Sequence, residues 1–201
     1  IAAACFVITL VLCSCVIYVK FFRDVDVFVP AQMTKNMPTT NCRPVSKDDI
    51  ASLEYDPNWK HTVRSMYWHM KNGDLEAISA FHMGDPTCFV LVRRNDSEDI
   101  LPMFNVAFRG YSPNSIVARN EESLACPGVI RNMVRATHVR VTYIDGATHR
   151  DMIELFTGPE AFALQHVVFY SQGRSICELY ATNADKGVNT LRELIVADTY
   201  H

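Results

Sequence analysis

Residues 165–173 read Gln-His-Val-Val-Phe-Tyr-Ser-Gln-Gly, and this stretch decides the fold. The apolar, Gly-free run that contains most of it predicts a helix over residues 158–172, which Gly173 is expected to end. His166 is an isolated imidazole in this helix. An isolated inward-facing His is more often a hydrogen-bonded core residue than a metal ligand, because one ligand does not make a site.

The rest of the chain predicts an α+β domain. Residues 46–49, Ser-Lys-Asp-Asp, have the pattern of a capping box and predict a helix that reaches towards residue 70, with Pro57 either kinking it or beginning a second helix. A final helix is expected over residues 188–197. Runs rich in β-branched and aromatic residues predict four strands, at 88–92, 103–108, 139–145 and 151–156.

The stretch at 165–173 resembles the Gln-His-Glu-x-Asp-His-x-x-Gly motif of peptide deformylases. Gln165, His166 and Gly173 match the motif, whereas Val167 stands where the Glu belongs and Tyr170 stands where the second His belongs. In that family, the two His bind a metal and the Glu is a general acid and base.

Two further stretches support the resemblance in the right order. Residues 121–128, Glu-Glu-Ser-Leu-Ala-Cys-Pro-Gly, resemble the family's Glu-Gly-Cys-Leu-Ser-Val-Pro-Gly, so Ser123 takes the position of the metal-binding Cys. Residues 77–84, Ala-Ile-Ser-Ala-Phe-His-Met-Gly, resemble Gly-Leu-Ala-Ala-Pro-Gln-Ile-Gly, and His82 replaces the Gln that helps to stabilise the oxyanion. The resemblance spans residues 50–180 and implies a mixed or antiparallel sheet around a central helix.

The residues at these positions predict that the chemistry of the family is absent. Ser123 is a poor metal ligand because an alcohol loses its proton far less readily than a thiol, and the longer Tyr170 would place its phenol oxygen elsewhere. Cys126 lies three residues further along an extended segment, so we expect it to face away and to be a small buried hydrophobe. Val167 cannot transfer a proton. We therefore predict no bound metal, no cofactor and no enzymatic activity, with Ser123, His166, Val167, Tyr170 and His82 as degenerate site positions.

Residues 1–19 contain no charged residue, and Lys20 and Arg23 follow directly. A helix of this length spans the hydrocarbon core of a bilayer, so we expect a transmembrane helix at 1–22, a linker at 23–46 and a deformylase-like domain at 47–201. A secretory signal or a buried core helix are the alternatives. Because the first residue is Ile, we expect further residues in front of it.

The net charge and the cysteine content bear on the binding partners and on the cellular compartment. The net charge is −3, which gives no electrostatic support for nucleic-acid binding. The seven Cys form no CxxC pair and no evident disulfide framework, which favours a reducing compartment.

The resemblance and the apolar run together suggest a non-catalytic accessory or structural subunit of a membrane complex. The mitochondrial inner membrane is the expected location, with a respiratory complex or the ATP synthase as host. The expected partners are other subunits and the lipid bilayer, which residues 1–22 would contact. One alternative is a peptide-binding module near a membrane-bound ribosome. Another is an active metal-dependent deformylase with a rebuilt site.

Overall fold

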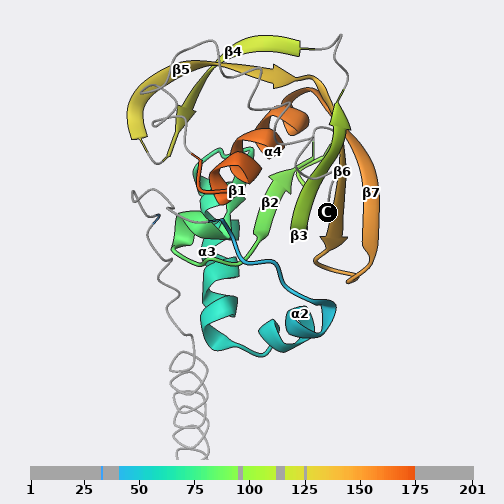
Figure 1. The fold of residues 1–201 in the computed structure, drawn as a ribbon. Helices are drawn as coiled ribbons and strands as arrows, with labels where there is room; N and C mark the ends of the chain where they lie inside the picture. Colours follow the sequence, from blue (N-terminus) through green and yellow to red (C-terminus); the bar gives the residue numbers. More distant parts are fainter. Residues whose placement is uncertain (1–32, 34–40, 95–96, 112–115, 125, 175–201) are drawn as a thin grey trace, which may run out of the picture.

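The structure is a computed structural model that describes residue 33 and residues 41–94, 97–111, 116–124 and 126–174 (Figure 1). Two antiparallel sheets lie on either side of the helix α4 (Gly158–Ser171). The other described elements are α2 (Lys47–Leu53), α3 (Pro57–Asn72), β1 (Ala77–Ser79), η1 (Ala80–Met83), β2 (Phe89–Arg93), β3 (Ile100–Tyr111), β4 (Ile116–Ser123), β5 (Cys126–Ala136), β6 (His138–Asp145) and β7 (Asp151–Thr157).

The larger sheet has the strand order β1-β2-β3-β6-β7, and β4 and β5 form a separate hairpin. Every pair of neighbouring strands is antiparallel. Figure 1 shows α4 between this hairpin and the larger sheet. The Gln165 side chain ties the helix to the end of β5, since its Oε1 accepts from the backbone N–H of Ala136 and its Nε2 donates to the carbonyl of the same residue. The predicted α+β fold around a central helix is confirmed, with antiparallel pairing.

The helices α2 and α3 each begin at an N-cap residue whose side chain accepts a hydrogen bond from the first turn. Ser46 and Asp49 make the reciprocal hydrogen bonds of a capping box at the start of α2, as predicted. Pro57 begins α3 instead of kinking a single long helix, and Asp56 is the N-cap, whose side chain accepts from the N–H of Asn58. Proline suits the first helical turn because the N–H that it lacks would have no partner there.

The larger sheet buries an apolar cluster on each face. On one face, side chains such as Val141 and Phe156 pack against Leu164 of α4. On the other face, α2 and α3 cover β1, β2 and β3, and we call this half of the domain the α2–α3 layer. Its buried core consists of Val45, Ile50, Trp59, Met66, Met70, Ile78, Ala80, Phe89, Leu91 and Phe104.

The hairpin β4–β5 was not predicted as strands. Its first strand is rich in charged residues that do not alternate cleanly with apolar ones, so periodicity gave no signal. The hairpin also corrects the argument about Cys126, which placed Ser123 and Cys126 on one extended segment. The two residues are instead paired across the turn, and directly opposite residues in an antiparallel pair share a face. The side chain of Cys126 lies outside the described part.

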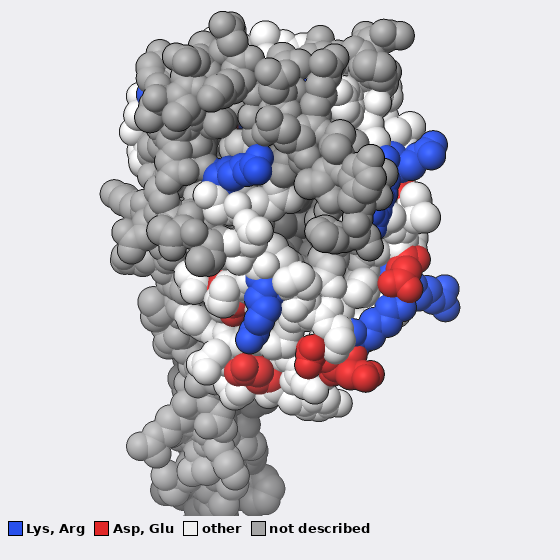
Figure 2. All heavy atoms as spheres, viewed as in Figure 1, with Lys and Arg blue, Asp and Glu red and all other residues white. Residues whose placement is uncertain are grey.

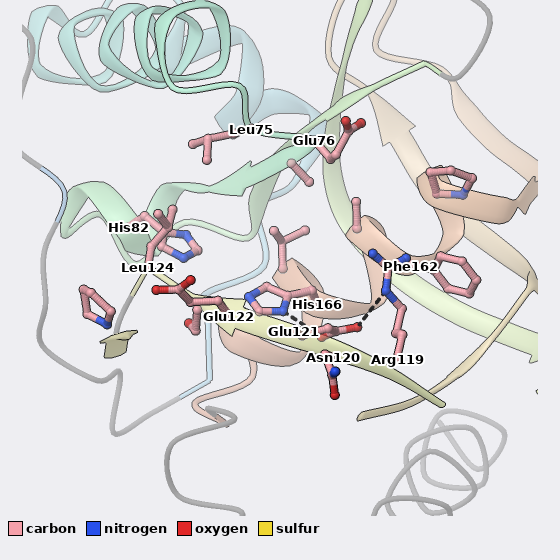
Figure 3. A pocket seen from close by; sticks show the side chains of 16 residues that line it. Leu75, Glu76, His82, Arg119, Asn120, Glu121, Glu122, Leu124, Phe162 and His166 are labelled. Carbon is pink, nitrogen blue, oxygen red and sulfur yellow. Dashed lines mark hydrogen bonds and ion pairs between the residues drawn. The ribbon is translucent and has the colours of Figure 1, made fainter. Parts of the chain in front are cut away.

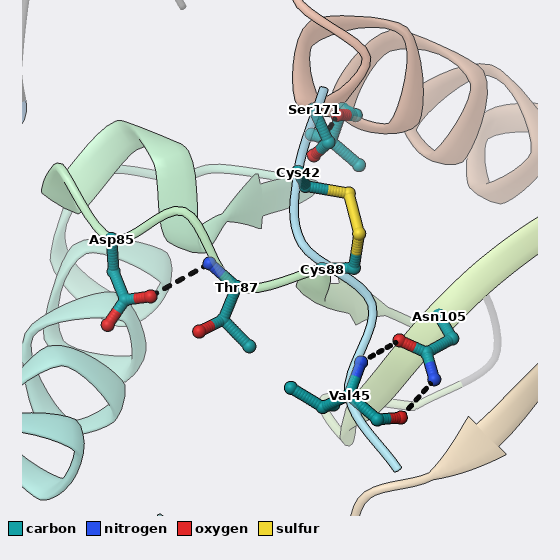
Figure 4. Close-up of a disulfide and its surroundings, with 8 residues drawn as sticks. Cys42, Val45, Asp85, Thr87, Cys88, Asn105 and Ser171 are labelled. Atoms are coloured by element: carbon teal, nitrogen blue, oxygen red, sulfur yellow. Dashed lines mark hydrogen bonds between the residues drawn. A yellow bond between two sulfur atoms is a disulfide. The ribbon is translucent and has the colours of Figure 1, made fainter. Parts of the chain in front are cut away.

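The cysteine prediction was wrong for one pair. Cys42 and Cys88 form a disulfide that joins the segment before α2 to the start of β2 (Figure 4). The Cys42 N–H also donates to the carbonyl of Ser171, the last residue of α4, at 2.7 Å. The bonded cysteines are 46 residues apart, and only the fold brings them together.

The predictions for the chain ends remain open. Residues 1–32 and the helix expected at 188–197 lie outside the described residues, and no helix within the described ranges is long and apolar enough to cross a membrane. The domain boundaries stay predictions. On the described part of the face in Figure 2, Lys and Arg side chains are interspersed with Asp and Glu.

Candidate functional site

A cleft with a volume of about 530 Å³ lies between α4, the hairpin strand β4 and the segment that leads into β1 (Figure 3). It is lined by Leu75, Glu76, Ala77, His82, Arg119, Asn120, Glu121, Glu122, Ser123, Leu124, Pro127, Pro159, Phe162, Ala163, His166 and Val167. Within the described ranges, β1 and β4 each pair with a single strand, so the cleft lies beside two open strand edges. A cleft of this size accommodates a small ligand.

A buried carboxylate organises one wall of the cleft. Glu121 accepts from Arg135 through both oxygens, at 3.0 Å from Nε and 2.8 Å from Nη2. The Nδ1 of His166 lies 3.0 Å from the Oε2 of Glu121 (Figure 3). Burial alone would raise the pKa of Glu121, but the hydrogen bonds from His166 and Arg135 outweigh burial and lower this pKa to about 2. The carboxylate is therefore ionised at neutral pH.

This carboxylate also sets the tautomer of His166. An ionised carboxylate only accepts hydrogen bonds, so Nδ1 carries the proton and donates to Glu121. In the neutral ring, Nε2 then holds a lone pair. The side chain of His166 is 19% exposed whereas that of Glu121 is 8% exposed, so the imidazole faces the cleft with the carboxylate behind it.

His82 has the opposite tautomer. Its Nδ1 lies 3.2 Å from the backbone N of Ser79, and a backbone N–H can only donate, so Nδ1 holds the lone pair and Nε2 carries the proton. The ring is 1% exposed, and its Nε2 has no hydrogen-bond partner within the described structure. Burial, and after it the charge that His166 carries when protonated, lower the pKa of His82 to about 3, so the ring is a neutral donor at physiological pH.

The structure brings together most of the positions predicted from the sequence. Ser123, His166, Val167 and His82 all line the cleft, while Tyr170 stacks on His82 with ring centroids 4.2 Å apart. His166 is hydrogen-bonded, as predicted, but it forms part of a cleft wall and not of the apolar core.

The described side chains of the cleft do not provide three protein ligands for a divalent metal, and the side chain of Cys126, opposite Ser123, lies outside the described part. The described residues contain no group of three or more His, Cys, Asp or Glu side chains that could hold a metal ion. His82 cannot contribute a lone pair from Nε2, because that atom carries the proton. Among the described imidazoles of the cleft, only that of His166 has a cleft-side nitrogen with a lone pair in its neutral form, and one such ligand does not make a metal site.

A model of the family described as polypeptide deformylase matches residues 32–183. The chain belongs to the polypeptide deformylase family. Among solved structures, the Thermus thermophilus deformylase covers 84% of this chain and 96% of its own at 19% identity, with a TM-score of 0.63. Deformylase 1B from Arabidopsis thaliana covers 84% and 89% at 19% identity, with a TM-score of 0.61. No curated protein matches the chain.

The family match corrects one prediction. We expected from the sequence that the chain is not an enzyme, and this is contradicted because the matched family and its structural neighbours are enzymes. No comparison shows that the catalytic residues of the family have been replaced. The prediction had rested on motif positions alone, without the side chains that surround them.

Sequence reasoning missed the charged groups behind His166. Glu121 begins the stretch at 121–128 that resembles the family, and Arg135 lies within the span of the resemblance, but no role was assigned to either. The contact between Glu121 and Arg135 does not follow even from the strand register, because the hairpin pairs Glu121 with Arg131 and Arg135 with Val117. The contact is visible only in the folded structure.

Proposed function

We propose that the cleft binds the N-terminal end of an extended peptide whose terminal amine carries a small acyl group. The observation that carries this proposal is the pair of imidazoles with opposite tautomers. His82 offers an N–H donor and His166 offers an acceptor, both lining one cleft. An amide presents a C=O and an N–H and can satisfy both. A free terminal ammonium has donors only, and it would leave the buried Nε2 of His82 without a partner.

The remainder of the cleft suits a short peptide. Leu75, Leu124 and Phe162 supply apolar surface for a side chain, and the open edges of β1 and β4 can pair with an extended backbone. Deformylases of the same fold from Acinetobacter baumannii have been solved with Met-Ala-Ser at a TM-score of 0.64 and 18% identity, and with actinonin at a TM-score of 0.62 and 19% identity. The first structure covers 76% of this chain and 99% of its own, and the second covers 76% and 98%.

Calorimetric titration tests this function with two peptides that differ only at the N-terminus. Formyl-Met-Ala-Ser should bind about 5- to 150-fold more tightly than Met-Ala-Ser, because one buried unpaired donor corresponds to about 1–3 kcal/mol. His82→Phe should reduce this preference to less than threefold. His138→Phe alters an exposed imidazole outside the cleft and is the matched control. Equal affinity for both peptides, or no binding at millimolar concentration, would refute the proposal.

The expected tether and partners remain part of the proposal. The uncharged run at residues 1–19 favours attachment to a membrane, and a peptide-binding cleft fits the alternative of a module near a membrane-bound ribosome. On the edge strand β7, Ile153 is 72% exposed and Leu155 is 57% exposed, which suits contact with another subunit. The full chain should stay in the membrane pellet after carbonate extraction. Substituting both side chains by Lys should release partner proteins without changing peptide affinity.

A further inference from the structure

We propose that Ser123, His166 and Glu121 act as nucleophile, general base and positioning carboxylate in metal-independent hydrolysis of the acyl group of the bound peptide, with the Nε2–H of His82 as the oxyanion donor. This inference rests on the proposed peptide-binding function. It adds a reaction and assigns each role to a side chain of this chain.

The base and its orienting group are already in place. Glu121 is fixed by two hydrogen bonds from Arg135, and its Oε2 receives the Nδ1–H of His166. A buried carboxylate that holds the Nδ1–H of an imidazole leaves the other ring nitrogen to accept a proton, and it stabilises the imidazolium that results. Arg135 is 2% exposed, so this support is shielded from solvent.

Ser123 is the candidate nucleophile because of its position on β4. It lies two residues beyond Glu121, and the burial of Glu121 and Ser123 alternates with the exposure of Glu122. The hairpin register is irregular between Glu122 and Ser123, so the shared side rests on the cleft itself: Ser123 and Glu121 both line it, as does His166, whose Nδ1 contacts Glu121. Ser123 is 2% exposed and lines the same cleft as His166.

His82 supplies the last requirement of acyl transfer. A tetrahedral intermediate carries a negative oxygen, and a preorganised, poorly solvated donor stabilises this oxygen. The Nε2–H of His82 is such a donor: it is buried, it has no partner among the described residues, and the Ser79 N–H fixes its tautomer from the opposite side. Stacking on Tyr170 holds the plane of the ring.

The reaction balances with water as the co-reactant. The Oγ of Ser123 forms a bond to the acyl carbon as its proton passes to the Nε2 of His166. The C–N bond then breaks, and the leaving amine takes that proton. Water attacks the acyl-serine, with His166 again as the base, and the Oγ–C bond breaks. The products are a carboxylic acid and the free N-terminal amine of the peptide, and Ser123 regains its proton.

A fluorophosphonate probe tests the nucleophile in the intact chain after dialysis against EDTA. Intact mass and peptide mapping should locate one adduct on Ser123, and p-nitrophenyl acetate should be hydrolysed with the same sensitivity to the probe. Ser123→Ala should abolish the adduct, and His166→Ala should slow its formation by about 10²–10⁴-fold. Ser52→Ala, which alters an exposed serine on α2, should be labelled at the wild-type rate. An adduct elsewhere, or no adduct, overturns the inference.

Peptide titration with the same variants separates this inference from the proposed function. Ser123→Ala should bind formyl-Met-Ala-Ser with wild-type affinity while showing no hydrolysis. If peptide binds to the wild-type chain but no serine adduct forms, the inference fails and the function stands. If no peptide binds, the function itself fails.

Glu121 requires a readout that a purely structural role would not affect. Glu121→Gln should lower the rate constant of adduct formation at saturating probe without weakening peptide binding, and Glu121→Asp should restore part of that rate. Loss of both rate and binding in a folded Glu121→Gln variant would show that Glu121 only supports the wall of the cleft, and this would overturn its assigned role.

Discussion

The α2–α3 layer and the cleft bury different kinds of side chain. The α2–α3 layer is built from apolar contacts, such as Trp59 against Phe89 at a centroid distance of 5.0 Å. The cleft instead buries Glu121, Arg135 and His82, at a relative exposure of 9% or less. Buried ionic and unpaired polar groups are costly unless they are matched, so their concentration at the cleft marks where the fold is specialised for a ligand and not for stability.

The largest expected loss of stability follows from removing the buried carboxylate of the cleft. Glu121→Ala leaves Arg135 buried without its carboxylate, and the free energy of unfolding should fall by about 3–5 kcal/mol. Urea unfolding measures this loss. The adjacent Glu122 is exposed and accepts one hydrogen bond from Gly128, so Glu122→Ala should cost about 1.5 kcal/mol or less. Similar losses for the two variants would show that burying the ion pair of Glu121 and Arg135 adds no stability.

The apolar half should affect stability without affecting binding. Met66 is fully buried in the α2–α3 layer, and Met66→Ala should lower the free energy of unfolding by about 2–5 kcal/mol. At temperatures where the variant stays folded, its affinity for formyl-Met-Ala-Ser should equal that of the wild type. Met152→Ala removes an exposed methionine on β7 and should cost little. A tenfold change in peptide affinity in Met66→Ala would show that the two halves are coupled.

The disulfide joins the segment before α2 to the start of β2, and the Cys42 N–H donates to the end of α4, so breaking the disulfide sharpens the comparison. Reduction of Cys42–Cys88 removes a constraint across 46 residues of sequence, and we expect a loss of about 2–4 kcal/mol in the free energy of unfolding. The Cys42→Ser/Cys88→Ser variant should show the same loss and no further response to reductant. If reductant destabilises this double variant equally, another thiol is responsible.

The sequence predicted the fold well where local patterns carry it. The capping box at Ser46 and the end of α4 at Gly173 follow from residues close together in the chain. The central helix and its position came from the family resemblance at residues 165–173. These features depend on neighbouring residues or on a recognisable motif, so one amino-acid sequence is sufficient to predict them.

The site was only partly predictable because its chemistry depends on pairing between strands and on tautomers. No local pattern shows that Arg135 reaches Glu121, or that the N–H of Ser79 fixes the proton of His82 on Nε2. The positions of Ser123 and His166 were identified, but each was judged alone. No disulfide was predicted between Cys42 and Cys88 because their spacing carries no signal. The fold brings them together, with Arg43 and Thr87 beside them in a parallel bridge.

The smallest effect isolates the buried imidazole of the cleft. The pKa of His82 is lowered from 6.5 to about 3, so below pH 6.5 the unfolded chain binds a proton that the folded chain does not. Stability should therefore fall with pH between 6.5 and 3, by roughly 2 kcal/mol from pH 7.5 to pH 5 for this group. Glu121, with its pKa lowered from 4.5 to about 2, contributes stability that is lost mainly as the pH falls from about 4.5 to 2. The two windows overlap between pH 4.5 and 3, and of these two groups only His82 acts between pH 7.5 and pH 5.

Urea unfolding at a series of pH values measures this dependence. His82→Gln should remove the part between pH 7.5 and pH 5 while leaving the loss below pH 4.5, because an amide does not titrate. His138→Gln, an exposed imidazole on β6, should keep the wild-type slope. An unchanged slope in His82→Gln would mean that His82 is protonated in the folded chain over the same pH range as in the unfolded chain. The cleft would then lack the fixed neutral donor that distinguishes it from the α2–α3 layer.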